Sequence, residues 1–235
     1  MLRLSTLLII LTLGLGCATV GTVMVPEELH DQLPPRIAED IEARLIHIAN
    51  PVGLGEVYYL ARVDTAERVV QVGYFLVWPG EFPDFGREYP VPRRERRRQI
   101  RLPLYYTNWL YIPRSGGLQR MMFGRGDVEG IGVTYELSDG ELGMPVAVSF
   151  EMPGHKSVTV PDSVGTMLLG EVVYRNAPYL QMASWNHMFK PPDEGVARQA
   201  FPVQPFPGEQ WERFNMDRRR AEIAKRGLAG SGSLP

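Results

Sequence analysis

RVVQVGYFLVW (residues 68–78) consists largely of β-branched and aromatic residues. Such side chains pack well on a pleated, half-buried surface and therefore favour β-strands. The preceding run VYYLARV (residues 57–63) has the same character, and Asp64-Thr65-Ala66-Glu67 between the two runs suits a tight turn. We therefore predict a β-hairpin over residues 57–78.

Further strand candidates follow along the chain. They cover residues 101–112, 127–137, 145–152, 156–160 and 171–174, and Ser138-Asp139-Gly140-Glu141 supplies a turn between two of them. The chain also contains 24 Gly and 20 Pro, which indicates many turns. This pattern predicts a mainly β fold, an antiparallel β-sandwich or a barrel-like sheet.

Two helices are expected at the ends of this β-rich region. In residues 36–49 the apolar positions have helical spacing: Ile37, Ile41, Leu45 and Ile48. This pattern predicts an N-terminal amphipathic helix, with His47 as a packing residue beside its apolar stripe. A C-terminal helix is expected over residues 211–228. The Pro-rich stretch 191–207 before it is expected to follow the domain surface without a packed core of its own.

The N-terminus has the features of an export signal. Arg3 is followed by an uncharged apolar run over residues 4–16, too short for the about 20 residues that span a bilayer. Gly14-Leu15-Gly16-Cys17 resembles the lipobox of bacterial lipoproteins, in which the cysteine is lipidated. That resemblance implies cleavage before Cys17, anchoring by acyl chains and, with Ala18 next, delivery to the outer membrane. Ordinary secretion with cleavage near Ala18 is the alternative.

These features predict a domain organisation and exclude some functions. We expect a signal peptide (1–16), a lipidated cysteine with a tether (17–34), one β-rich domain (35–210), and a C-terminal helix with a flexible tail (211–235). Cys17 is the single cysteine, which excludes an intramolecular disulfide and, once lipidated, a thiol nucleophile. The net charge of −2 argues against a general nucleic-acid binder.

The densest charge in the chain lies at residues 93–101. This cluster could bind anionic lipid headgroups, lipopolysaccharide or another polyanion, or it could be a solvated loop. Its arginines are Arg93, Arg94, Arg96, Arg97, Arg98 and Arg101.

Asp127 and Glu129 are the most informative acidic pair. On a strand, residues two apart point to the same face, so both carboxylates would share one face of an otherwise apolar strand. Carboxylates placed in this way must be solvated, paired with cations or bound to a metal. Arg114, Arg120 and Arg125 are near enough in sequence to be the cations.

Residues 126–130, Gly-Asp-Val-Glu-Gly, resemble a Gly-Asp-Trp-Glu strand of Vps62-like and necrosis-inducing-like proteins. The resemblance extends to residues 145–150, His155 and Ser184-Trp185-Asn186-His187. It implies a β-sandwich in which Asp127, Glu129, His155 and His187 are candidate ligands of a divalent metal. The chain departs from the pattern at Val128, where the family has tryptophan, and at Arg125 and Gly126, where necrosis-inducing proteins have histidines.

No Gly-x-Ser-x-Gly hydrolase motif occurs in the chain. We therefore expect a lipid-anchored cell-envelope protein with a binding or structural role, no catalysis and no cofactor. Its partners would be the membrane, reached through the lipid, and envelope components. Two alternatives remain open: a metal-assisted hydrolase that uses Asp127, Glu129 and a histidine, and a polyanion binder that uses the arginines of residues 93–101.

Overall fold

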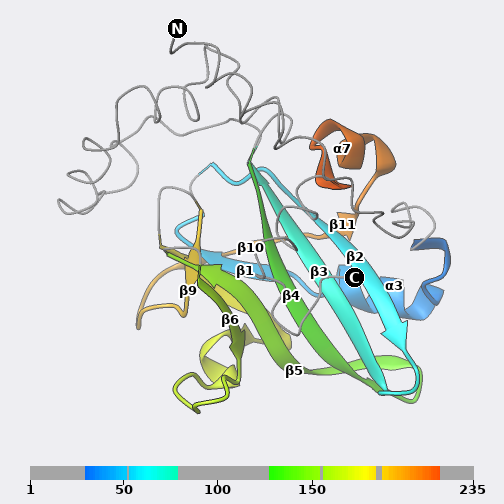
Figure 1. Cartoon of the computed structure of the whole chain (residues 1–235), viewed down its shortest axis with the longest axis horizontal. Coiled ribbons are helices and arrows are strands. Elements are labelled where there is room, and N and C mark those ends of the chain that lie inside the picture. Colours follow the sequence, from blue (N-terminus) through cyan, green and yellow to red (C-terminus); the bar gives the residue numbers. More distant parts are fainter. Residues whose placement is uncertain (1–29, 52, 79–126, 154–155, 184–186, 218–235) are drawn as a thin grey trace, which may run out of the picture.

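Two β-sheets form the body of the protein in the computed structural model (Figure 1), which describes residues 30–51, 53–78, 127–153, 156–183 and 187–217. The larger sheet has the order β11-β2-β3-β4-β5-β6, and the smaller has the order β10-β1-β8-β7 with β9 beside β8. Most neighbouring strands are antiparallel, whereas β1–β8 and β11–β2 are parallel. The predicted mainly β fold with two packed sheets is confirmed.

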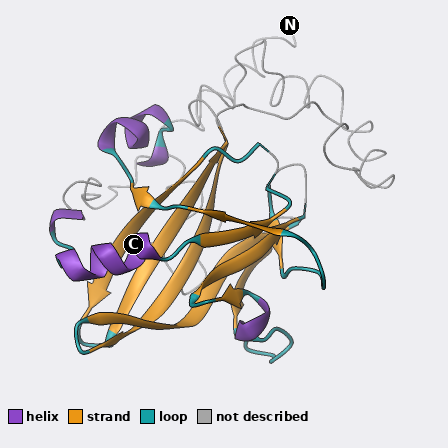
Figure 2. Ribbon diagram, turned by 180° about the vertical axis from the view of Figure 1, so that it is seen from behind, coloured by secondary structure: helices purple, strands orange, loops and turns teal. Residues whose placement is uncertain are grey.

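The larger sheet contains β2 (Glu56–Asp64), β3 (Val69–Trp78), β4 (Asp127–Ser138), β5 (Glu141–Met152), β6 (Lys156–Val160) and β11 (Gln204–Pro205). The smaller sheet contains β1 (Ile46–Ala49), β7 (Val173–Tyr174), β8 (Ala177–Met182), β9 (Phe189–Lys190) and β10 (Arg198–Phe201). Two helices, α3 (Pro35–Ala43) and α7 (Gly208–Arg213), and a 3-10 turn, η2 (Leu169–Glu171), complete the described elements (Figure 2).

The predicted hairpin of β2 and β3 is confirmed. Its turn is closed by Asp64, whose Oδ1 accepts hydrogen bonds from the backbone N–H groups of Ala66 (3.1 Å) and Glu67 (3.0 Å). Arg68 completes the turn with φ of 53°. An aspartate that binds the backbone two residues on is a common way to close such a turn, and it fixes the register of the pair.

The main core lies between the sheets. Alternate residues of β3 point into it, from Val70 to Trp78, and Ile46, Ile48 and Leu180 of the smaller sheet meet them. Ile37 and Ile41 of α3 join the same core, and each is almost fully buried. Burying a side chain of this size stabilises the fold by roughly 1.5–3 kcal/mol.

The outer face of the larger sheet is covered by the C-terminal segment. Tyr58 and Phe75 on this face pack against Phe206 and Trp211, with ring centroids 4.7 Å apart for Tyr58–Phe206 and 6.1 Å apart for Phe75–Trp211. Phe214 and Met216 belong to the same cluster. The sheet is therefore buried on both faces here, which explains why β3 reads as a nearly continuous apolar run.

The expected helix over residues 36–49 was wrong in its second half. α3 ends at Ala43, Arg44 is extended (φ −94°, ψ 108°), and Ile46–Ala49 forms β1. Leu45, which the helical spacing included, is 41% exposed, whereas Ile46 is fully buried. Pairing with β8 on one side and β10 on the other satisfies the backbone of β1, and this tertiary gain outweighs local helical spacing.

The expectation for the Pro-rich stretch 191–207 was wrong in part: residues 193–200 are mostly exposed, as expected of a surface segment, but the stretch also pairs with both sheets. Residues 198–201 form β10 and residues 204–205 form β11, so this stretch adds a strand to each sheet. Phe201, Val203 and Phe206 are buried. Proline is tolerated here because both strands lie at sheet edges, where a missing N–H leaves no ladder bond unmade.

The C-terminal helix begins earlier than expected, at Gly208 instead of Trp211, and α7 ends at Arg213. Residues 218–228 of the expected helix and strand candidate 101–112 lie outside the described residues. Within the residues that the structure covers, no helix is both long and apolar enough to cross a membrane.

Candidate functional site between the two sheets

Trp78, Asp127 and His187 meet at one end of the sandwich. Trp78 closes β3 and Asp127 opens β4, and the two residues are register partners. Partners in a ladder share a face, and Trp78 belongs to the core between the sheets, so Asp127 points to this inner side. His187 precedes β9 of the smaller sheet. The three residues thus connect the sheets.

Asp127 and His187 form a direct pair, with 2.6 Å between Asp127 Oδ2 and His187 Nδ1. Asp127 Oδ1 accepts a second hydrogen bond from the backbone N–H of Val128 at 3.1 Å. Because a carboxylate only accepts hydrogen bonds, His187 Nδ1 carries the proton. The other ring nitrogen, Nε2, is therefore the one available for chemistry in the neutral ring.

The imidazole of His187 is held rigidly. It stacks on the indole of Trp78, with centroids 4.0 Å apart and planes 9° from parallel. The residue is fully buried, and its backbone has φ of 57°, a left-handed conformation that costs a residue other than glycine about 1–2 kcal/mol. Strain of this kind persists only where the surrounding structure enforces it, and it is concentrated at functional sites.

His187 Nε2 is buried, and it has no hydrogen-bond partner within the part of the chain that the structure describes. Leaving a buried polar atom unpaired costs about 1–3 kcal/mol, and native proteins keep few such atoms, often at sites that bind or react. A histidine with Nδ1 fixed by a carboxylate and Nε2 left unpaired has the hydrogen-bond arrangement of a metal ligand or a general base.

The structure brings together only some of the predicted metal ligands. Asp127 and His187 are in contact, and Glu129 lies on the same face of β4 opposite Leu76. Over residues 30–217, outside the gaps in the description, no group of three or more His, Cys, Asp or Glu side chains could hold a metal ion. Of the four predicted metal ligands, Asp127 and His187 therefore form a pair, and the described residues do not supply a complete set of metal ligands.

Several predicted site residues lie outside the described residues. They are Cys17, His155, and the arginines Arg93, Arg94, Arg96, Arg97, Arg98 and Arg101. Trp78, which stacks on His187 in this site, was not predicted from the sequence. The available signal was its position at the last residue of an apolar strand.

A separate cavity of about 240 Å³ is lined by residues 55–57 and 201–204, where β11 joins the larger sheet. Its lining is mostly apolar, and Glu56, its only ionisable residue, accepts a hydrogen bond from the Tyr58 hydroxyl at 2.6 Å. The other polar side chain in its lining is that of Gln204, so the cavity offers few polar groups to orient a ligand.

Comparisons with known proteins give little further information. No family model matches the chain, and no curated protein matches it. Among solved structures, the chain is similar to one titled "NLPPya in complex with mannosamine", at 14% identity and a TM-score of 0.34. The match covers 71% of this chain and spans 55% of that one. The β-sandwich assignment therefore depends on the two sheets described above, and no family membership is shown.

Proposed function

We propose that this chain is a lipid-anchored binding protein of the bacterial cell envelope, held at the outer membrane. The anchor is inferred from the lipobox-like residues 14–17. The ligand site that we propose is the end of the sandwich where Trp78, Asp127 and His187 meet.

The observation that carries this proposal is the unpartnered Nε2 of His187 beside the Asp127 pair. A purely structural histidine at this position would be expected to pair both nitrogens or to be replaced by an apolar residue. Trp78 and the left-handed backbone hold the ring in one orientation, which lowers the entropic cost of binding to it.

A metal-assisted hydrolase is the second candidate, and the same pair favours it. A carboxylate bound to Nδ1 orients a histidine so that Nε2 can coordinate a divalent metal. Glu129 lies on the same face of β4 as Asp127, the partner of this histidine, but a hydrolytic metal centre needs at least three protein ligands. This candidate therefore requires a further ligand from outside the described residues.

Binding of a polyanion through the arginines of residues 93–101 stays a prediction from sequence. It requires salt-sensitive association with anionic liposomes that is lost when Arg96, Arg97 and Arg98 become Ser. Association that these substitutions leave unchanged would make the cluster a solvated loop.

Metal analysis separates the two candidates at the central site. The full chain is extracted from membranes in detergent without chelator, and its metal content is measured beside that of Asp127→Ala. The hydrolase predicts stoichiometric metal that the substitution removes. The binding protein predicts no stoichiometric metal, together with a bound organic molecule that is lost in His187→Asn.

A further inference from the structure

The outer face of the smaller sheet carries a cluster of cationic and aromatic side chains, whereas Asp127 lies on the inner face of the larger sheet. His47 on β1 is the register partner of Tyr179 on β8. Ile46 and Ile48, the neighbours of His47 along β1, point into the core, so His47 and its partner Tyr179 lie on the opposite face of the sheet. Arg198, at the start of β10, pairs with Ala49 on this same face.

Tyr174 is the centre of the cluster. The guanidinium carbon of Arg198 lies 3.7 Å from its ring centroid, and that of Arg175 lies 5.3 Å from it. Because both distances are measured to the same ring centroid, the separation of the two guanidinium carbons cannot exceed the sum of the two distances. The ring of His47 meets Tyr174 edge-on at 5.0 Å, and Tyr179 lies 6.0 Å from the Arg198 guanidinium.

Neither guanidinium has a counter-ion among the described residues. The ion pairs in that part of the chain are Arg36–Glu141, Lys190–Asp193 and His187–Asp127, and the side chains of Arg175 and Arg198 form no hydrogen bond or ion pair there. Two unpaired cations held against one ring repel each other, and the free energy of this arrangement falls when an anion binds between them.

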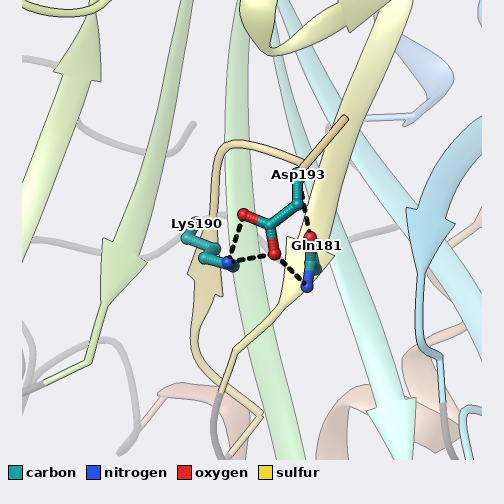
Figure 3. Close-up of polar contacts among 3 residues, drawn as sticks. All are labelled: Gln181, Lys190 and Asp193. Carbon is teal, nitrogen blue, oxygen red and sulfur yellow. Dashed lines mark hydrogen bonds and ion pairs between the residues drawn. The ribbon is translucent and has the colours of Figure 1, made fainter. Parts of the chain in front are cut away.

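A carboxylate on the same face is already occupied. Asp193 accepts hydrogen bonds from Lys190 (2.6 and 2.5 Å) and from the side chain of Gln181 (3.2 Å), as Figure 3 shows. Its backbone N–H also donates to Gln181 Oε1 at 2.8 Å. These bonds lower the pKa of Asp193, Lys190 contributing most, so it stays ionised and engaged. Asp193 is therefore not the counter-ion of the two arginines.

The backbone fixes both arginines in place. Arg175 (φ 48°) and Asn176 (φ 63°) are the two central residues of the tight turn between β7 and β8. Two successive residues with positive φ form the turn that matches strand twist, although arginine is an unusual choice there. On the other side, the Tyr179 hydroxyl donates to the carbonyl of Val196 at 3.3 Å, which ties the segment before Arg198 to the sheet.

We propose that Arg175 and Arg198, with Tyr174 and His47 between them, form a binding site for a phosphate group. Stacking on a ring uses the face of a guanidinium and leaves its N–H edge free, and that edge matches two oxygens of a phosphate. His47 Nδ1, which is buried and has no hydrogen-bond partner among the described residues, adds a third polar atom to the cluster. The phosphate belongs either to a free anion or to a lipid headgroup.

The state of His47 supports this assignment and provides a readout. Burial, and then the charges of Arg198 and Arg175, lower the pKa of His47 below its ordinary value of 6.5. The ionisable groups recorded around the ring are these two arginines and the tyrosines 174 and 179. A phosphate that neutralises the arginines will therefore raise the pKa of His47.

The experiment follows the His47 ring by NMR in the full chain, held in phosphate-free maltoside micelles at constant ionic strength. One arm adds inorganic phosphate. The other adds phosphatidylglycerol to the micelles, with uncharged diacylglycerol as its control. We expect a saturable shift of the His47 signals and a raised His47 pKa in at least one arm. Phosphate alone identifies a soluble ligand, and phosphatidylglycerol identifies a headgroup.

Variants show whether the two arginines are responsible. Arg198→Gln and Arg175→Gln should each weaken binding by about tenfold, the effect of losing one charge-assisted hydrogen bond. Arg62→Gln removes the same charge from an exposed position on β2 and should leave binding unchanged. Because all three positions are exposed, folding should persist, and the dispersion of the NMR spectrum checks it. No shift in either arm, or equal weakening by Arg62→Gln, would overturn the proposal.

Discussion

His187 Nδ1 lies 2.6 Å from Asp127 Oδ2. Asp127 is the first residue of β4 in the larger sheet and His187 lies just before β9 of the smaller sheet, so this pair links the two sheets. The side chain of His187 is fully buried and that of Asp127 is 13% exposed. Solvent therefore screens the pair weakly, and each partner would be costly to leave alone.

A double-mutant cycle should detect this coupling. Asparagine tolerates positive φ, so His187→Asn removes the ring without adding backbone strain. Combined with Asp127→Ala, it should give a coupling energy of about 1–3 kcal/mol in urea unfolding. Single-variant effects that simply add, to within about 0.5 kcal/mol, would mean that the pair contributes nothing to stability.

Arg44 should be sensitive even to a conservative change. Its guanidinium donates to the carbonyls of Gly143 (2.8 Å), Asn176 (3.2 Å) and Leu142, and it lies 5.0 Å from the Tyr135 ring. Lysine cannot reproduce this fork, so Arg44→Lys should lower the free energy of unfolding by about 1–3 kcal/mol.

The matched control is Arg36, which pairs with Glu141 at the surface with side chains 65% and 53% exposed. Arg36→Lys should change the free energy of unfolding by less than about 1 kcal/mol. Equal losses in the two variants would show that Arg44 is not the link between α3, β5 and the β7–β8 turn.

The buried hydroxyls of Tyr74 and Tyr135 lie 2.9 Å apart. Tyr74→Phe or Tyr135→Phe leaves one hydroxyl unpaired and should cost about 1–3 kcal/mol, whereas the double variant should cost less than the sum of the two. Urea unfolding of the three variants measures this difference. A double variant that costs the full sum would contradict the idea that the hydroxyls satisfy each other.

The same two tyrosines predict a loss of stability at high pH. Burial raises the pKa of Tyr135 to about 12 and that of Tyr74 well above its ordinary value of 10.0. The unfolded chain thus releases these protons first, so the stabilisation is complete below pH 10 and declines as the pH rises from 10 toward 12. The double phenylalanine variant should show a shallower decline over this window, and an unchanged slope would refute the assignment.

Trp211 should be the main contact of the C-terminal segment with the larger sheet. Its ring packs on Phe75 and Phe206, and its Nε1 donates to Asp217 Oδ1 at 2.9 Å. Trp211→Ala should cost about 3–5 kcal/mol and expose apolar surface that binds a hydrophobic dye. Trp211→Phe, which keeps most of the packing, should cost clearly less; equal dye binding by both would contradict this role.

The sequence predicted the larger sheet well because its strands carry their own signals. β2 to β5 are 9 to 12 residues long and rich in β-branched or aromatic residues, and the β2–β3 and β4–β5 turns contain Asp or Gly, so composition and periodicity suffice. The smaller sheet was mostly missed. β1 and β8 are short, and they pair with each other in parallel. They become strands only when segments far apart in the sequence pair, and the residues within either segment do not indicate that pairing.

The candidate site was predictable only in part. Asp127 was identified by its strand register with Glu129, and His187 by its resemblance to a family motif, but 60 residues separate the pair. The stack of His187 on Trp78 depends on the packing of two sheets. The cluster around Tyr174 was hidden because His47 was assigned to a helix, where it would not face β8 and β10.

Native mass spectrometry of the full chain, extracted from bacterial membranes in mild detergent, tests the binding proposal most directly. The spectrum reports both the acyl chains on Cys17 and any molecule held without a covalent bond. We predict a lipidated chain with an additional bound mass, lost in His187→Asn and kept in His30→Asn, which removes a histidine from outside the site. An unlipidated chain beginning at Ala18, or bound masses identical in all three proteins, would contradict the account.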